Sequence, residues 1–217
     1  MDPRDRRLYF LLGLALLAAL LFLLSPAGAA PGRALLKPVP VLCLALLALP
    51  SAPDRYASLM AWGLAVSAVG DLLLEGEGLF LAGLATFLLA HLLYLSAFVF
   101  DVRRISPARL VPFLAWGGIA FALLRPGLHA MTWPVVAYMA AIVAMMWRAA
   151  ARVGVSPRGE TSAWWALLGA VLFGASDTLI AFDRFGQKVE GVRLPILLLY
   201  WIGQAGLARS ARPDRLW

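Results

Sequence analysis

Histidine and cysteine are nearly absent from this chain of 217 residues, which contains two histidines and one cysteine. Zinc sites draw most of their ligands from these two residue types, and the H-E-x-x-H pattern of zinc hydrolases does not occur. We therefore expect no metal site. Cys43 has no second cysteine for an internal disulfide, and we expect it to be a buried small residue.

Charge is also scarce. Charged residues make up 14% of the chain and hydrophobic residues 62%, and the mean hydropathy is +0.83. So little polar surface cannot cover a soluble globule of this size, and we predict an integral membrane protein. The net charge of +7 does not indicate nucleic-acid binding, because the basic residues lie singly or in pairs between apolar stretches. We expect the protein to lie in a membrane and to bind no nucleic acid.

Three common motifs are missing as well: the G-x-S-x-G elbow, the Walker A loop and the G-x-G-x-x-G turn. These motifs mark the nucleophile of many serine hydrolases and the phosphate-binding turns of nucleotide-binding proteins. Their absence disfavours both classes of function.

The chain consists mainly of long apolar stretches. Short connections rich in turn residues separate them. A helix needs about 20 residues to cross the hydrocarbon core of a bilayer, and somewhat fewer or more if it is tilted. The stretches that qualify are residues 8–25, 36–50, 56–74, 79–100, 108–124, 131–151, 162–182 and 193–209. We predict an all-α polytopic membrane helix bundle of about eight helices, forming one domain over residues 1–217. The second helix is the shortest, because Pro38, Pro40 and Pro50 limit it.

The basic residues indicate the orientation of the bundle. With the N-terminus in the cytoplasm, 13 of the 19 lysines and arginines fall on cytoplasmic loops and tails, as the positive-inside rule favours. We predict that both termini are cytoplasmic and that the membrane is a bacterial inner membrane. The stretch 8–24 follows the basic residues MDPRDRR as a secretory signal would, but equally apolar stretches come after it. We expect it to be retained as the first membrane helix.

Ionisable and strongly polar residues inside the predicted spans are the candidates for function, because a charge at the bilayer centre costs at least about 2.5–3.5 kcal/mol. These residues are Lys37, Asp71, Glu75, His91, Tyr94, Tyr138, Asp177, Tyr200 and Gln204. In the predicted orientation, Lys37, Asp71 and Asp177 lie toward the outer ends of their spans. A shared site in the outer half of the bundle is therefore geometrically allowed.

Helical spacing groups some of these candidates. His91 and Tyr94 are three residues apart, and Tyr200 and Gln204 are four apart, so each pair shares one face of its helix. Each of these two faces can point a polar pair inward.

Structural roles account for the same residues and stay open at this point. Buried charges persist when they are paired. Asp71 pairing with Lys37 or a tyrosine would hold helices together, as would Asp177 pairing with Arg184 two turns along its helix. Glu75 opens the EGEG turn, where a carboxylate is ordinarily solvated or level with the lipid headgroups. The histidine, the tyrosines and the glutamine can equally be packing residues with internal hydrogen-bond partners.

Two carboxyl groups in an apolar bundle suit acid-catalysed hydrolysis of an acetal-like or enol-ether bond. Burial and a nearby like charge favour the neutral form of one carboxyl group, which serves as general acid. Its ionised partner activates water or stabilises an oxocarbenium-like cation, as in glycoside hydrolysis. The alternative is a non-catalytic small transporter or lipid-binding protein in which Asp71 and Asp177 form a proton relay or an ion-pair lock.

Five short patterns in order along the chain resemble the lysoplasmalogenase, or YhhN-like, family of multi-span membrane proteins. They are KP at 37–38, S-x-x-G-D-x-x-L at 67–74, G-L-x-x-F-x-x-x-H-x-x-Y at 83–94, SD at 176–177 and Y-W-x-x-Q at 200–204. None is specific alone, but their order and spacing extend over most of the chain. The resemblance covers the second to the eighth predicted spans.

The resemblance implies an eight-helix fold and hydrolysis of the vinyl-ether bond of lysoplasmalogens, which are lysophospholipids with an alkenyl chain. The products would be a fatty aldehyde and glycerophosphoethanolamine or glycerophosphocholine. It also implies that Asp71 and Asp177 are the catalytic pair, without a metal or organic cofactor. Lys37, Tyr138 or Tyr200 would bind the phosphate, and the other polar candidates would contribute to substrate binding. The headgroup preference, the roles of the two aspartates and the oligomeric state are not specified.

Overall fold

Helices form every regular element in the part of the chain that the computed structural model describes, which is residues 3–26, 32–186 and 190–212. A helix lies in each of the eight stretches predicted from the sequence. The α-helices are α1 (Pro3–Leu24), α2 (Gly32–Leu36), α3 (Val39–Ala48), α4 (Arg55–Glu75), α5 (Phe80–Asp101), α6 (Val111–Leu128), α7 (Thr132–Arg152), α8 (Gly159–Phe185) and α9 (Arg193–Ser210). Short 3-10 turns η1 (Pro107–Arg109) and η2 (His129–Met131) flank α6. The prediction of an all-α fold is confirmed.

Two predicted boundaries are wrong, and proline is involved in both. The stretch 36–50 is not one helix, because the chain turns at Lys37 and Pro38 between α2 and α3. The residues 125–129, predicted as a turn, continue α6 through Pro126 to Leu128. Gly127 packs so tightly there that an added Cβ atom would lie 1.9 Å from the Phe185 carbonyl oxygen. The end of α6 therefore lies directly against the end of α8.

Five helical stretches are long and apolar enough to cross a membrane, judged by length and composition over the described residues. They are Asp5–Leu24, Arg55–Glu75, Phe80–Asp101, Pro107–Arg152 and Gly159–Phe185. The stretch Pro107–Arg152 contains both α6 and α7. The count of eight spans and the cytoplasmic termini stay predictions, and the chain ends lie outside the described residues.

The chain divides into two compact units, within helix α5. Among the described residues, unit 1 ends at Ala97 and unit 2 begins at Phe98. In unit 1, α3 packs against both α1 and α4. In unit 2, α8 packs against α6, α7 and α9. The single membrane domain over residues 1–217 stays a prediction.

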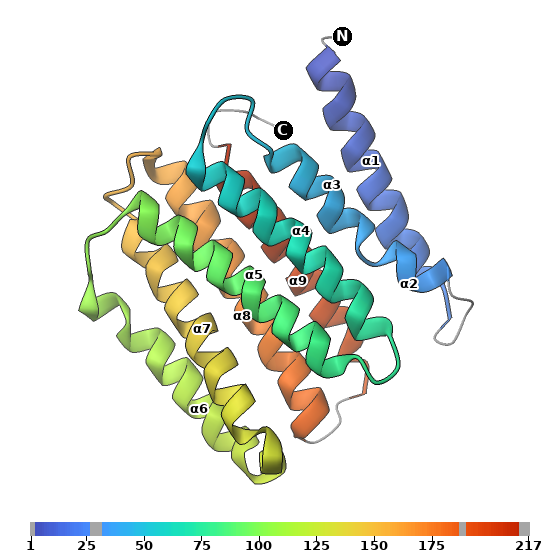
Figure 1. Cartoon of the computed structure of the whole chain (residues 1–217), viewed down its shortest axis with the longest axis vertical. Coiled ribbons are helices and arrows are strands. Elements are labelled where there is room, and N and C mark those ends of the chain that lie inside the picture. The colour runs from blue at the N-terminus through green and yellow to red at the C-terminus, as the bar shows by residue number, and fades with distance from the viewer. Residues whose placement is uncertain (1–2, 27–31, 187–189, 213–217) are drawn as a thin grey trace. The chain divides into compact units, whose positions relative to one another are not determined.

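Aromatic rings set the packing of α4 against α5 in unit 1, where the two helices lie side by side (Figure 1). A Cβ atom on Gly63 would lie 2.3 Å from Tyr94 Cε1, and one on Gly70 would lie 2.7 Å from Phe87 Cε2. The two glycines therefore leave room for the α5 rings. Gly70 directly precedes Asp71, so this packing also holds the backbone of a candidate residue.

Glycines also allow close contact between the backbones of α8 and α9 in unit 2. A Cβ atom on Gly169 would lie 2.6 Å from the Leu207 nitrogen and 2.7 Å from the Gly203 carbonyl oxygen. Small residues at such crossings are typical of membrane helices, because close backbone approach maximises van der Waals contact. This crossing positions Asp177 on α8 and Tyr200 on α9 within one packed pair of helices.

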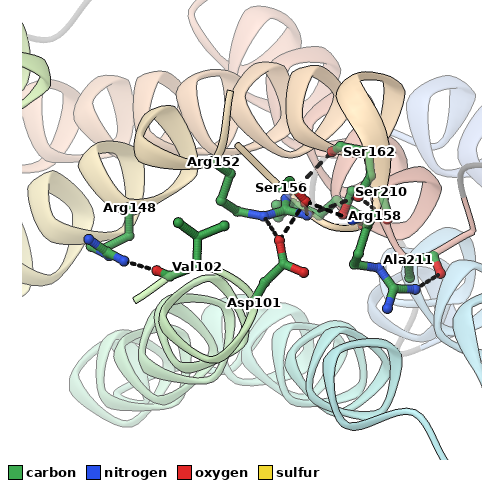
Figure 2. Close-up of polar contacts among 10 residues, drawn as sticks. Asp101, Val102, Arg148, Arg152, Ser156, Arg158, Ser162, Ser210 and Ala211 are labelled. Carbon is green, nitrogen blue, oxygen red and sulfur yellow. Dashed lines mark hydrogen bonds and ion pairs between the residues drawn. The ribbon is translucent and has the colours of Figure 1, made fainter. Parts of the chain in front are cut away.

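A buried ion pair joins several elements of unit 2 (Figure 2). The guanidinium group of Arg152 on α7 donates from Nε to Asp101 Oδ2 at 2.7 Å and from Nη2 to Ser162 Oγ at 2.9 Å. Ser156 also donates to Asp101 Oδ2, and Ser162 donates to the Ser210 carbonyl oxygen. The network therefore ties together the ends of α5, α7, α8 and α9.

Other arginines of unit 2 bind carbonyl groups at or just beyond helix ends. Arg148 donates to the Val102 and Arg104 carbonyls after α5, Arg109 to the Ala150 and Val153 carbonyls at the end of α7, and Arg158 to the Ala211 carbonyl after α9. The last carbonyls of a helix have no partner within it, and a cation there also complements the helix dipole. These arginines, which the sequence analysis used only to predict the orientation, therefore also bind the ends of helices in unit 2.

Replacing Gly169 with leucine should destabilise the protein by about 1–3 kcal/mol, because backbone atoms of α9 occupy the space of the new side chain. The measurement is thermal unfolding in detergent. Gly118→Leu is the control, because a Cβ atom there has no neighbour within 4 Å. Equal unfolding temperatures for the two variants would contradict the close α8–α9 contact.

Replacing Asp101 with alanine should destabilise the protein by about 3–5 kcal/mol, because it leaves the buried Arg152 guanidinium without its carboxylate. Thermal unfolding of the purified protein measures this loss. Asp183→Ala removes an exposed carboxylate and should change stability little. If both variants unfold at the wild-type temperature, the network does not support the fold.

Candidate functional site

Four charged side chains of unit 1 form a ladder, which we call the charge ladder: Arg33, Glu75, Lys37 and Asp71. The Lys37 Nζ atom lies 3.8 Å from Asp71 Oδ1 and 3.1 Å from Glu75 Oε1. The Arg33 Nη1 atom lies 3.3 Å from Glu75 Oε2. Glu75 therefore joins two cations, and Lys37 joins two carboxylates. The predicted Lys37–Asp71 pair is confirmed.

Matching helical spacings produce the ladder. Asp71 and Glu75 are four residues apart on α4, and Arg33 and Lys37 are four apart on α2 and the turn that follows it. The side chain of Asp71 is 2% exposed, whereas that of Glu75 is 20% exposed. The ladder therefore has a buried end at Asp71 and a more accessible end at Glu75, the last residue of α4.

Arg33 is a residue that the sequence analysis missed. Besides its bond to Glu75, it donates from Nε to the Ser25 carbonyl oxygen, and its guanidinium group lies 4.2 Å from the centre of the Phe22 ring. Only its spacing from Lys37 pointed to a shared face, and it lies in a predicted connection where an arginine is ordinary. Its partners are Phe22 on α1, Ser25 just after α1, and Glu75 on α4. Only the tertiary structure brings these three residues together.

Two further candidates lie on α5 in unit 1. His91 is fully buried, and its Nδ1 atom lies 2.7 Å from the Phe87 carbonyl oxygen. Because a carbonyl oxygen can only accept, this contact assigns the proton of the neutral ring to Nδ1. The Tyr94 hydroxyl lies 3.4 Å from Ser67 Oγ on α4. The predicted shared face of His91 and Tyr94 is thus turned into the protein.

Asp177 of unit 2 is bound by Tyr138. The Tyr138 hydroxyl donates to Asp177 Oδ2 at 2.6 Å, and both residues are buried. Tyr138 comes from α7 and Asp177 from α8. The structure therefore connects two candidates that lie 39 residues apart, whose contact no local spacing predicts.

The two neighbours of Asp177 on α8, Ser176 and Thr178, also make hydrogen bonds to other helices. Ser176 donates to the Ile196 carbonyl oxygen of α9 at 2.9 Å. Thr178 accepts a hydrogen bond of 3.2 Å from the Trp116 indole of α6. With the Tyr138 bond from α7, residues 176–178 make one side-chain contact with each of three neighbouring helices. Such a network restricts the rotation and sliding of α8 around Asp177.

The remaining candidates, Tyr200 and Gln204, lie on the buried side of α9. The Tyr200 ring centre lies 5.6 Å from that of Phe173 on α8, at an interplanar angle of 55°. Gln204 is fully buried. Their predicted shared face is therefore the face that packs within unit 2.

Asp71 and Asp177 provide the two carboxyl groups of the candidate site, and the two have different partners. Asp71 has an ammonium group beside it, and Asp177 accepts from a phenol. Among the described residues, no group of three or more histidine, cysteine, aspartate or glutamate side chains is arranged to hold a metal ion. The chemistry available to these residues is proton transfer, charge stabilisation and anion binding.

Comparison with known proteins gives consistent matches over most of the chain. The profile of the YhhN family matches residues 32–211. Human lysoplasmalogenase TMEM86B is 37% identical over 180 residues, which cover 82% of this chain and 74% of that protein. Bovine lysoplasmalogenase TMEM86A is 35% identical over 198 residues, 84% of this chain and 79% of that protein. A lysoplasmalogenase of Mycobacterium bovis is 30% identical over 191 residues, 82% and 70% of the two chains. No solved structure matches significantly.

Proposed function

This chain belongs to the YhhN family of membrane proteins, and from that premise we propose that it hydrolyses the vinyl-ether bond of lysoplasmalogens. The relatives that carry the name lysoplasmalogenase are 30–37% identical to it. The proposed products are a fatty aldehyde and glycerophosphoethanolamine or glycerophosphocholine. The substrate is a lysophospholipid with an alkenyl chain, drawn from the membrane in which the protein lies.

The observation that carries the proposal is that Asp71 and Asp177 are both buried in a chain with very few charges, each with a specific partner. Cleavage of a vinyl ether needs a proton donor and a group that stabilises a cation. Carboxyl groups supply both functions in glycosidases, whose transition state resembles an oxocarbenium ion. The proposal assigns the same two functions to these aspartates.

The reaction follows from the chemistry of the bond. The general acid protonates the outer vinyl carbon, and the electron pair of the double bond forms the new C–H bond. The inner carbon and the ether oxygen then share a positive charge, which the ionised carboxylate stabilises while it directs water to that carbon. The water loses a proton, and the resulting hemiacetal breaks its bond to the glycerol oxygen. Aldehyde and alcohol leave, and the net addition is one water molecule.

The partners of the two aspartates suggest how the roles are divided. We assign the ionised role to Asp71, because the Lys37 ammonium lies beside its carboxylate. We assign the role of general acid to Asp177, whose carboxyl group the neutral phenol of Tyr138 orients through a hydrogen bond to Oδ2. The remaining candidates then bind the substrate. They are Lys37, Glu75, His91, Tyr94, Tyr138, Tyr200 and Gln204.

The proposal includes the topology predicted from the sequence, with eight membrane spans and both termini in the cytoplasm of a bacterial cell. In that arrangement Asp71, Glu75 and Asp177 lie toward the outer ends of their helices. Lysophospholipid headgroups in the outer leaflet would lie at the same depth.

Aldehyde release from 1-alkenyl lysophosphatidylethanolamine or lysophosphatidylcholine by the purified protein tests the reaction. Asp71→Asn and Asp177→Asn should each lower kcat by at least about 100-fold, the usual contribution of a general acid or base. Asp183→Asn changes an exposed aspartate and should have wild-type activity. Thermal unfolding confirms that each variant is folded.

Two outcomes would contradict this proposal in different ways. A folded wild-type protein that releases no aldehyde from either lipid is not a lysoplasmalogenase and favours a transporter or lipid-binding role. Folded variants that keep full activity would instead exclude catalysis by the two aspartates.

Replacing Tyr138 with phenylalanine tests the positioning of Asp177. The variant keeps the ring and loses the hydroxyl that donates to Oδ2, so kcat should fall about tenfold with little change in KM. Tyr9→Phe, at an exposed tyrosine of α1, is the matched control. A raised KM with unchanged kcat would show that Tyr138 acts in substrate binding only and does not orient Asp177.

A further inference from the structure

Glu75 occupies a position between two cations in the charge ladder of unit 1. One of its carboxylate oxygens faces the Arg33 guanidinium group at 3.3 Å, and the other faces the Lys37 ammonium group at 3.1 Å. Arg33 is held from its other sides by the Ser25 carbonyl and the Phe22 ring. The cation pair is therefore already positioned for an anion with two oxygens.

A phosphodiester has the same features as this carboxylate. It carries one negative charge shared by two oxygens, and arginine and lysine are the usual residues that bind it. A phosphodiester that replaced Glu75 between Arg33 and Lys37 would leave the charge of those two cations balanced. The Glu75 carboxylate would then require a new cation.

We propose that the charge ladder recognises a zwitterionic lysophospholipid headgroup, with the phosphate bound by Arg33 and Lys37 and the headgroup amine bound by Glu75. This inference rests on the proposed function and deepens it. The headgroup enters between the existing partners, so every charge is paired before and after binding. Pairing matters because the side chains of Arg33 and Lys37 are about 10% exposed, and an unpaired charge at that depth is costly.

The spacing of the ladder fits the substrate. Asp71 lies one helical turn deeper than Glu75, which corresponds to about 6 Å along the axis of α4. In the lysolipid, five covalent bonds separate the phosphorus from the vinyl-ether oxygen, a span of about 6 Å when extended. A phosphate at the level of Glu75 thus places the vinyl ether at the level of Asp71.

Binding of ligands that cannot be cleaved tests this inference. The ligands are 1-O-alkyl lysophosphatidylethanolamine, 1-O-alkyl glycerophosphoethanol, which keeps the phosphodiester and lacks the amine, and 1-O-alkyl glycerol, which lacks both charges. Calorimetry in a non-ionic detergent measures each affinity. Wild-type protein should bind the zwitterion most tightly and the alkyl glycerol most weakly.

Two variants should act in different directions. Arg33→Gln should weaken binding of both phosphate-containing ligands about tenfold, or about 1.4 kcal/mol, and leave alkyl glycerol unchanged. Glu75→Gln should remove the preference for the zwitterion over alkyl glycerophosphoethanol and should tighten binding of alkyl glycerophosphoethanol, because the cations lose their internal anion. The controls are Arg6→Gln and Glu77→Gln, which change exposed residues of the same unit.

Three results would overturn the inference. In the first, Arg33→Gln and Glu75→Gln each change the affinities for all three ligands by the same factor, which indicates that the Arg33–Glu75 ion pair is purely structural. They could also leave all three affinities unchanged. Inorganic phosphate alone could bind wild-type protein as tightly as the zwitterionic lipid, which indicates a site for free anions.

The binding assay separates this inference from the proposed function. Headgroup recognition that depends on Arg33 and Glu75, in a protein that releases no aldehyde, supports the headgroup site and contradicts the hydrolase. Aldehyde release whose KM is the same in wild type, Arg33→Gln and Glu75→Gln supports the hydrolase and contradicts the headgroup site.

Discussion

A charge removed from water needs a partner, and this requirement governs the protein because its chain is so apolar. Arg152 and Asp101 meet it by pairing with each other and with serines, in a network that joins helix ends in unit 2. Lys37 and Asp71 meet it in unit 1. Because polar groups are few, each such contact determines how particular helices pack.

The same requirement gives the two candidate aspartates, Asp71 and Asp177, different surroundings. Asp71 belongs to a ladder of alternating charges, which becomes more accessible toward Glu75. Asp177 accepts a hydrogen bond from Tyr138, on a helix that hydrogen bonds connect to three neighbouring helices. The two candidate aspartates therefore have different partners, an ammonium group for Asp71 and a phenol for Asp177.

Glycine has a complementary role, because it lets the helices that carry these groups approach closely. Gly70 makes room for the Phe87 ring beside Asp71, and Gly169 allows the backbones of α8 and α9 to touch. In a membrane, apolar side chains gain little by leaving lipid, so such close contacts and polar bonds supply the packing energy. The positions of the candidate residues therefore depend on small residues that have no chemical role themselves.

The helical fold and its approximate segments could be predicted from the sequence, because long apolar stretches allow only helices in a bilayer. The ion pair of Lys37 with Asp71 was also foreseeable, since two opposite charges in apolar surroundings need each other. Tertiary structure alone revealed Arg33 in the ladder, the Tyr138–Asp177 bond and the continuation of α6 through Pro126. The first two join residues far apart in the chain, and the physical reason is that helical periodicity states which residues share a face but not which helix that face meets.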